Sequence, residues 1–441
     1  MGKSKTKMSA LQLTVIVAVN MMGSGIIMLP SNLAQVGTIS IISWIVTALG
    51  ALALAWTFAQ CGMLSRNSGG MGGYAQYTFG KSGNFMANYG YAVSLVISNV
   101  AISVSVVAYA TVFLGITLSP IANTLAIIFV IWLSTVVNFG SASLTGKFGS
   151  VVVWGIIIPL VLLVVIGWFW FSPSQWIHSW NPHHYTLANG IKSAIPLTLW
   201  AFLGLESASA NMDAVENPQK NVPIACLAGT IIAAVLYIIS TEVMAGIVPL
   251  HALATSNAPF GLAFATMFNP TVGKIIMGLM VIACFGSLMA WQFTVAEVFR
   301  SSAFEGYFPK IFTKVTSKEV PIVGMIILAI VQTVFAFMTI SPNLNAQFQV
   351  IVNLAVVTNM VPYLLSMASL QNMQIVEKAK FGAKKLRFNT IIAVLAGIYT
   401  LYALYTAGSQ AMLYGGIVAM AGWTIYGFLA HRFNKEEGML A

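Results

Sequence analysis

Charged residues are scarce in this chain of 441 residues, at 7% of the composition. A soluble globular protein carries about 25%. Asp, Glu, Lys and Arg are absent from five long runs, Met8–Ser65, Ser82–Gly146, Phe148–Ile191, Val320–Val376 and Phe388–His431. A helix needs roughly 20 apolar residues to cross a membrane, and all five runs are long enough for at least one. The sequence therefore excludes a soluble domain and predicts an all-α polytopic membrane protein.

Cysteine and histidine are also rare, with three and five copies. The cysteines, Cys61, Cys226 and Cys284, are widely spaced and fit neither a disulfide framework nor a zinc pattern. Three histidines fall in the polar segment His178–His184, which we expect to be a solvated loop. The apolar runs hold no His-rich or paired-carboxylate set, which argues against a membrane enzyme. We expect no metal and no cofactor.

Length and turn signals divide the apolar runs into about 12 membrane helices. We expect helices one to five within residues 11–172, six to ten within 191–370, and eleven and twelve within 388–431. Residues 1–10 and 432–441 are the expected terminal segments. Helix three is expected to begin near Phe85. The glycine-rich segment Ser68–Ala75 before it is expected on the cytoplasmic side, as a flexible hinge or a short helix on the inner surface.

The net charge of +10 is distributed unevenly between the two sides of these helices. If the N-terminus is cytoplasmic, all 20 Lys and Arg residues except Lys192 and Lys274 face the cytoplasm. Such a bias sets the orientation of helical membrane proteins. The basic surplus thus indicates cytoplasmic termini and gives no reason to expect a nucleic-acid partner.

Helix one contains the stretch Asn20–Pro30, with Gly23-Ser24-Gly25 at its centre. Each glycine costs a helix about 1 kcal/mol relative to alanine. A helix that breaks inside the membrane exposes N–H and C=O groups that can hold a zwitterion. Close packing of a neighbouring helix against the glycines is the alternative interpretation.

A second irregular stretch, Ile195–Ala210, carries Gly204 and Glu206 in the middle of helix six. A carboxylate at this depth is costly and is therefore a functional candidate, although a purely structural pairing is the alternative. Five helices precede helix six, so the second half of the chain is inverted relative to the first. Two interrupted helices at matching positions of inverted halves indicate a transport site and favour a break at Gly23–Gly25.

These stretches resemble the amino acid–polyamine–organocation superfamily, and within it the bacterial antiporters that exchange basic amino acids for diamines. The likeness extends from about Lys7 to Phe433 and is carried by the following segments: Asn20–Pro30, Ser68–Ala75, Leu199–Ala208, Asn217–Ala225, Gly286–Trp291 and Glu305–Pro309. As a departure from the family pattern, Gln76 stands where relatives have an acidic residue.

The resemblance implies a LeuT-like fold, a five-plus-five inverted repeat followed by two extra helices, with helices one and six broken. It implies that Ser24 and Gly25 meet a substrate carboxylate, and that Glu206 forms an inner gate with Tyr91 and Tyr363. The full set expected to bind substrate is Gly23, Ser24, Gly25, Asn99, Trp200, Gly204, Glu206 and Trp291.

The expected function is exchange of a cationic amino acid, ornithine, for its decarboxylated diamine, putrescine, across the bacterial cytoplasmic (inner) membrane. Lysine/cadaverine and arginine/agmatine are alternative substrate pairs. A proton- or sodium-coupled amino acid symporter is an alternative mechanism, and a channel is another. The expected partners are these small molecules and the lipid bilayer. Helices eleven and twelve lack charges at mid-membrane and are candidates for the contact in a homodimer.

The charge bias leads to a prediction about orientation. A single cysteine placed at position 183, in an otherwise cysteine-free variant, should react with an impermeant thiol reagent added to intact cells. A cysteine at position 435, in the C-terminal segment, should react only after permeabilisation. The reverse pattern would contradict the orientation, whereas two cysteines reacting on the same side would contradict the helix count on which the inverted repeat rests.

Overall fold

The structure is a computed structural model, and it describes residues 8–22, 24–67, 69–140, 152, 154–206, 215–317, 320–379 and 381–436. These residues form helices joined by short turns, and their one β-bridge pairs Met8 with Val215. The elements are α1 (Ala10–Met21), η1 (Ser24–Ile26), α2 (Leu29–Ala34), α3 (Ser40–Leu64), α4 (Met71–Leu114), α5 (Pro120–Asn138), α7 (Trp154–Ile166), η2 (Gly167–Phe169), α8 (Pro173–His178), α9 (Leu187–Trp200), α10 (Pro218–Ile247), α11 (Leu250–Thr255), α12 (Pro259–Met267), α13 (Pro270–Phe304), η4 (Lys310–Thr313), α14 (Ile322–Met338), α15 (Leu344–Val376), α16 (Ala383–Thr406) and α17 (Ser409–Glu436).

Within the described residues, 8 helices are long and apolar enough to cross a membrane. Shorter apolar helices cover Ala10–Met21, Trp154–Phe169 and Ile322–Met338. Large apolar side chains on the outside of the long helices are exposed, among them Phe129 (65%) and Phe428 (77%). This surface is suited to lipid rather than water, because soluble proteins rarely expose large contiguous apolar patches. The expectation of a polytopic helical membrane protein is thereby confirmed.

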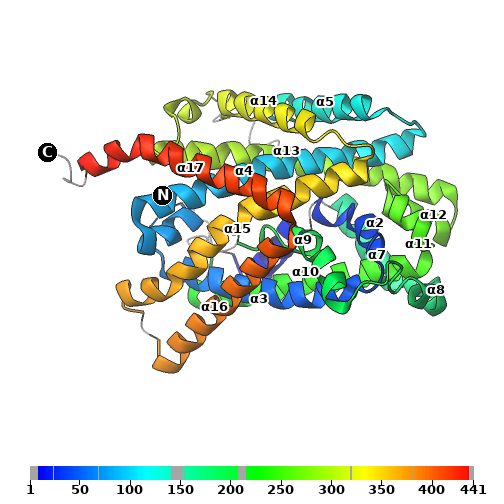
Figure 1. Cartoon of the computed structure of the whole chain (residues 1–441), viewed down its shortest axis with the longest axis horizontal. Helices are drawn as coiled ribbons and strands as arrows, with labels where there is room; N and C mark the ends of the chain where they lie inside the picture. The colour runs from blue at the N-terminus through cyan, green and yellow to red at the C-terminus, as the bar shows by residue number, and fades with distance from the viewer. Residues whose placement is uncertain are drawn as a thin grey trace, which may run out of the picture.

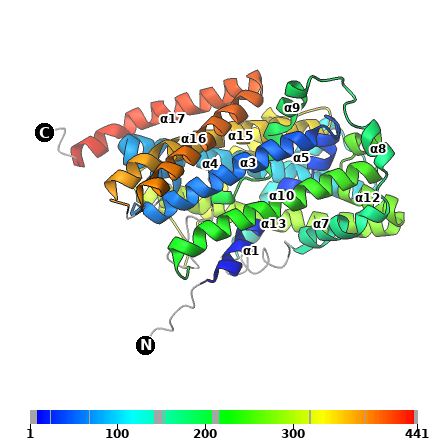
Figure 2. The same ribbon diagram turned by 90° about the horizontal axis from the view of Figure 1, so that it is seen from below.

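The long helices run roughly along the long axis of the molecule (Figure 1). Helices α8, α11 and α12 gather at the right-hand end of that axis, whereas α17 ends at the left-hand end (Figure 1). Helices α5 and α14 pack side by side over α4 and α13 (Figure 1), and α16 and α17 lie at the periphery (Figure 2). The interior is formed mainly by α4, α13 and α15; α3 and α9 pack on α15, and α1 packs on α10, which lies against α3.

The first predicted helix is broken. Helix α1 starts with a capping box and ends at Met21. In the box, the Ser9 hydroxyl oxygen accepts from the backbone N–H of Gln12, and the side-chain oxygen of Gln12 accepts from the backbone N–H of Ser9. A 3-10 turn, Ser24–Ile26, comes next, and α2 resumes at Leu29 with Pro30 in its first turn. Proline suits that position because the first helical N–H groups have no intrahelical acceptor. The break expected at the Gly-Ser-Gly stretch is confirmed, although Gly23 lies outside the described residues.

The second predicted break also occurs. Helix α9 ends at Trp200, and the chain continues in turns through Gly204 to Glu206. Gly204 has a φ of 107°, a left-handed conformation that favours glycine. Residues 207–214 lie outside the described part of the chain.

Helix α4 consists of two helical parts that meet at Gly80, whose φ of 63° and ψ of −157° are not helical. The first part begins at Met71, so most of the glycine-rich segment forms a short helix, which is one of the two structures expected for it. The second part, after Gly80, corresponds to predicted helix three and begins a few residues earlier than expected. Glycines lower helix propensity, but tertiary packing can override this. Met71 and Tyr74 are buried against the core, and this burial holds the segment in a helix.

Candidate functional site

The two breaks lie against each other, and glycine allows the contact. A Cβ added to Gly204 would lie 3.2 Å from the carbonyl oxygen of Asn20, in the last turn of α1. A Cβ on Gly25 would lie 3.4 Å from Cα of Ala201. The distance at Gly204 is tighter than a Cβ normally allows, whereas the distance at Gly25 is an ordinary contact, so the main chains of the two breaks lie directly against each other. Backbone polar groups freed by both breaks therefore lie at one place inside the protein.

A cavity of about 50 Å³ lies beside this contact. The two broken segments form part of its wall, and α4, α13 and α15 form the rest. Its lining consists of Asn20, Met21, Gly25, Tyr91, Ser94, Leu95, Ser98, Ile102, Trp200, Leu203, Gly204, Glu206, Trp291 and Asn359. The structure thus brings together Gly25, Tyr91, Trp200, Gly204, Glu206 and Trp291 from the residues that the sequence singled out.

Glu206 is buried at this site and is held from three directions. Its Oε1 accepts a hydrogen bond from the Tyr91 hydroxyl at 3.1 Å. Its Oε2 accepts from the Tyr363 hydroxyl at 2.7 Å and from the Gly204 N–H at 3.1 Å. Tyr91 belongs to α4 and Tyr363 to α15, so one carboxylate joins both helices to the second break. The expected grouping of Glu206 with Tyr91 and Tyr363 matches these contacts.

Two polar atoms at the cavity have no hydrogen-bond partner among the described residues. One is the indole N–H of Trp200, which would lie 3.8 Å from a Cβ on Gly25. The other is Oδ1 of Asn359. Buried polar groups in proteins are nearly always hydrogen-bonded, so a free donor and a free acceptor at one cavity indicate a polar ligand.

Asn99 is not in the lining, contrary to the expectation from the family resemblance. It is completely buried, and its amide donates to Oε1 of Gln292 at 2.6 Å. The helical period explains the difference. Tyr91, Ser94 and Ser98 follow one another at helical spacing on the cavity side, and Asn99 is rotated by about 100° from Ser98.

The sequence places Tyr91, Ser94 and Asn99 along roughly one face of this helix, and the structure keeps Tyr91 and Ser94 on the cavity side. Ser98 and Ile102 were not identified as candidates, although they continue the same line at helical spacing in the charge-free run Ser82–Gly146. Asn20 gave no such signal, because its position depends on how α1 meets Gly204. Of the predicted residues, Gly23 lies outside the described part, and only the backbone of Ser24 is described.

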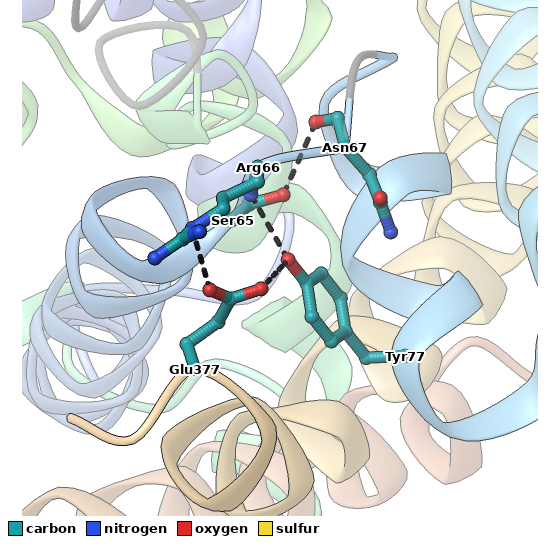
Figure 3. Close-up of polar contacts among 5 residues, drawn as sticks. All are labelled: Ser65, Arg66, Asn67, Tyr77 and Glu377. Atoms are coloured by element: carbon teal, nitrogen blue, oxygen red, sulfur yellow. Dashed lines mark hydrogen bonds and ion pairs between the residues drawn. The ribbon is translucent and has the colours of Figure 1, made fainter.

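A second polar cluster joins the ends of α3, α4 and α15 (Figure 3). The Arg66 guanidinium lies 2.7 Å from Oε2 of Glu377, and the Tyr77 hydroxyl donates to Oε1 of Glu377 at 2.6 Å. The same hydroxyl accepts from the backbone N–H of Arg66 at 2.9 Å (Figure 3). Because Arg66 is largely exposed, the Tyr77–Glu377 bond is the better-shielded contact.

Gln76 lies next to this cluster. Its side-chain oxygen accepts from the Asn84 amide at 2.8 Å, across the interruption at Gly80. The residue is therefore tied to its own helix and is only partly buried.

Comparison with known proteins agrees with this geometry. The family model described as amino acid permease matches residues 8–429. The chain belongs to this family, part of the amino acid–polyamine–organocation superfamily. It is 60% identical to the putrescine transporter PotE of Escherichia coli K12 over 438 residues, covering 99% of both chains. It is 58% identical to the PotE protein of Haemophilus influenzae over 437 residues, covering 99% of this chain and 100% of that one.

A more distant relative is the cadaverine/lysine antiporter of Escherichia coli K12. It is 30% identical over 447 residues, which cover 98% of this chain and 97% of the relative. All three relatives are named as transporters, in agreement with the expectation of a transporter rather than an enzyme.

Proposed function

We propose that this protein is a secondary transporter that exchanges ornithine for putrescine by alternating access. The observation that carries the proposal is the position of Glu206, a buried carboxylate where two broken helices meet, in a cavity that also contains two tryptophans. The 60% identity to a putrescine transporter supports this diamine over cadaverine, since the cadaverine/lysine antiporter is 30% identical.

The substrate carboxylate is proposed to bind at the break in the first helix. There the Trp200 indole N–H is free and lies beside Gly25. Freed N–H groups of an interrupted helix are suited to an anion because they carry partial positive charge. Gly23 and the Ser24 side chain belong to the same proposed subsite, which a diamine leaves empty because it has no carboxylate.

The ammonium groups are proposed to meet Glu206 and the faces of Trp200 and Trp291. A cation over a tryptophan face is stabilised by about 0.5–2 kcal/mol. The free Oδ1 of Asn359 is an additional acceptor in the same wall. We propose a supporting role for Asn99, through the wall behind the cavity rather than through direct contact.

Glu206, Tyr91 and Tyr363 are proposed to form the inner gate. A cavity of about 50 Å³ holds only a few water molecules. Entry of a diamine or an amino acid therefore requires this group to open. A bound ammonium competes with the two hydroxyls for the carboxylate, which couples occupancy to gating. Exchange becomes obligatory if the empty protein seldom reorients.

We further propose the LeuT-like arrangement of 12 helices, with inverted repeats at 11–172 and 191–370 and two extra helices at 388–431. The pair of facing breaks supports this arrangement. The charge bias supports cytoplasmic termini (residues 1–10 and 432–441) in the bacterial inner membrane. The proposed homodimer uses α16 and α17, which lie at the periphery (Figure 2).

The first prediction from this proposal concerns substrate pairing. Reconstituted vesicles loaded with putrescine or ornithine should accumulate labelled ornithine faster than vesicles loaded with cadaverine, lysine, agmatine or arginine. Empty vesicles should show almost none. Equal uptake by empty and loaded vesicles would indicate a channel or symporter, and imposed sodium or proton gradients would separate those two.

A related prediction concerns Gln76. If Gln76 weakens attraction of a dication, Gln76→Glu should raise putrescine exchange relative to ornithine exchange.

The second prediction concerns the aromatic pair. Trp200→Leu and Trp291→Leu should each weaken apparent affinity about five- to thirtyfold, since each removes a cation–π contact of about 1–2 kcal/mol. Trp168→Leu, at an exposed position after α7, is the matched control and should leave affinity unchanged. Competition binding on purified protein measures the effect. Wild-type affinity in both cavity variants would remove these tryptophans from the site.

The third prediction concerns Glu206. A proton and a bound ammonium compete for its carboxylate, so Glu206→Gln should reduce exchange severely and flatten the pH profile of the remaining amino acid binding. Glu242→Gln is the control, because Glu242 is also buried but bonds to Trp176 away from the cavity. The measurement is putrescine and ornithine uptake from mildly acid to mildly alkaline pH. A wild-type rate and profile in Glu206→Gln would make this residue structural.

A further inference from the structure

Four buried polar side chains from four different helices meet behind the wall of the cavity. Asn99 comes from α4, Thr135 from α5, Gln292 from α13 and Gln332 from α14. All four are at most 3% exposed. None carries a charge, so their burial avoids the desolvation cost of an ion.

Gln292 is the centre of this group and uses its full hydrogen-bonding capacity. Its Oε1 accepts from Asn99 at 2.6 Å and from the Gln332 amide at 2.7 Å. Its Nε2 donates to Gln332 Oε1 at 2.8 Å and to Thr135 Oγ1 at 3.0 Å. The two glutamine carboxamides thus bond reciprocally. An amide in this arrangement fixes both the rotation and the depth of its helix, because any shift breaks several bonds at once.

The group is adjacent in sequence to two residues of the cavity wall. Gln292 follows Trp291 on α13, and Asn99 follows Ser98 on α4. The 2.6 Å bond between Asn99 and Gln292 therefore sets how far apart the two walls stand at that level. Neither amide lines the cavity, so their influence on a ligand must pass through the neighbouring side chains.

We infer that Gln292 is a positioning residue that sets the location of Trp291 against the α4 wall and thereby determines affinity for the substrate ammonium. This inference rests on the proposed role of Trp291 in binding. It assigns to Gln292 a role in ligand recognition that is exerted without contact to the ligand.

The variant Gln292→Met has nearly the same size but removes all four hydrogen bonds. It leaves the side-chain amides of Asn99 and Gln332 without their Gln292 partner, and a buried polar group without a partner destabilises the protein. The double variant Gln292→Met/Gln332→Met removes both members of the reciprocal pair, so Gln332 no longer leaves an unpaired amide and the cost in stability is smaller than in the single variant. Both variants lose the bond to Asn99, so an effect on affinity that is equal in the two, at different stabilities, reports the loss of position.

A matched control exists elsewhere in the protein. Asn389 on α16 is also completely buried, donates to Gln60 and Gln374 at 3.2 Å and accepts from Trp56 at 3.1 Å. This second amide group does not line the cavity. Asn389→Leu should lower thermal stability without changing substrate affinity.

The test is a double-mutant cycle between positions 291 and 292, with ornithine affinity measured by competition binding on purified full-length protein. Gln292→Met and the Gln292/Gln332 double variant should each weaken affinity about tenfold in the wild-type background. In the Trp291→Leu background the same changes should have almost no further effect, because the side chain they position is gone. Thermal unfolding of each variant reports stability separately.

The outcomes are distinct. The inference would be overturned if the losses of affinity at positions 291 and 292 multiplied independently. It would also be overturned if the loss of affinity followed thermal stability in every variant, including Asn389→Leu. Either result would leave the binding role of Trp291 intact. No effect of Trp291→Leu by itself would instead refute the proposed binding site.

Discussion

The structure depends on one contact, the packing of two interrupted helices backbone to backbone. Gly204 makes it possible, because its φ of 107° favours glycine and a Cβ there would press on the Asn20 carbonyl oxygen. In a membrane, every backbone group released by a break needs a partner, and the protein can offer one only where it excludes lipid. The Gly204 N–H finds its partner in the Glu206 carboxylate, two residues further along the chain. The same contact that interrupts the helices therefore fixes the functional carboxylate.

Glu206 connects the second break to two long neighbouring helices. Tyr91 and Tyr363 bring α4 and α15 to the same carboxylate, and these two helices pack along much of their length. Roughly four helical turns away, the same helices are joined again by Tyr77 and Glu377. The hydrogen bonds to Glu206 lie at the cavity, and the Tyr77–Glu377 bond lies near the helix ends. The proposed opening at Glu206 therefore depends on how α4 and α15 are positioned along their whole length.

The amide group around Gln292 differs physically from Glu206. The proposed role of Glu206 requires a carboxylate that can exchange partners, whereas the amides around Gln292 are neutral and Gln292 itself makes four hydrogen bonds. Gln292 has little reason to rearrange, because each bond lost leaves an unpaired group in an apolar interior. A fixed Trp291 and a carboxylate that can be released together suit the proposed exchange, in which one site holds two ligands in turn.

The sequence by itself determined the class of the protein and the positions of its breaks. Charge-free runs can only be membrane helices, and glycines beside a buried carboxylate mark a helix that does not continue, so both inferences depend on local composition. The buried carboxylate singled out Glu206, and the family resemblance singled out Tyr91, Trp200 and Trp291, which line the cavity with it, and Tyr363, whose hydroxyl donates to it. The resemblance also placed Asn99 in the cavity, where the structure does not have it. There was no reason in the sequence to single out Gln292 or Asn20. Those features were decided only by the tertiary structure, because the rotation of one helix against another is set by hydrogen bonds and packing between residues far apart in the chain.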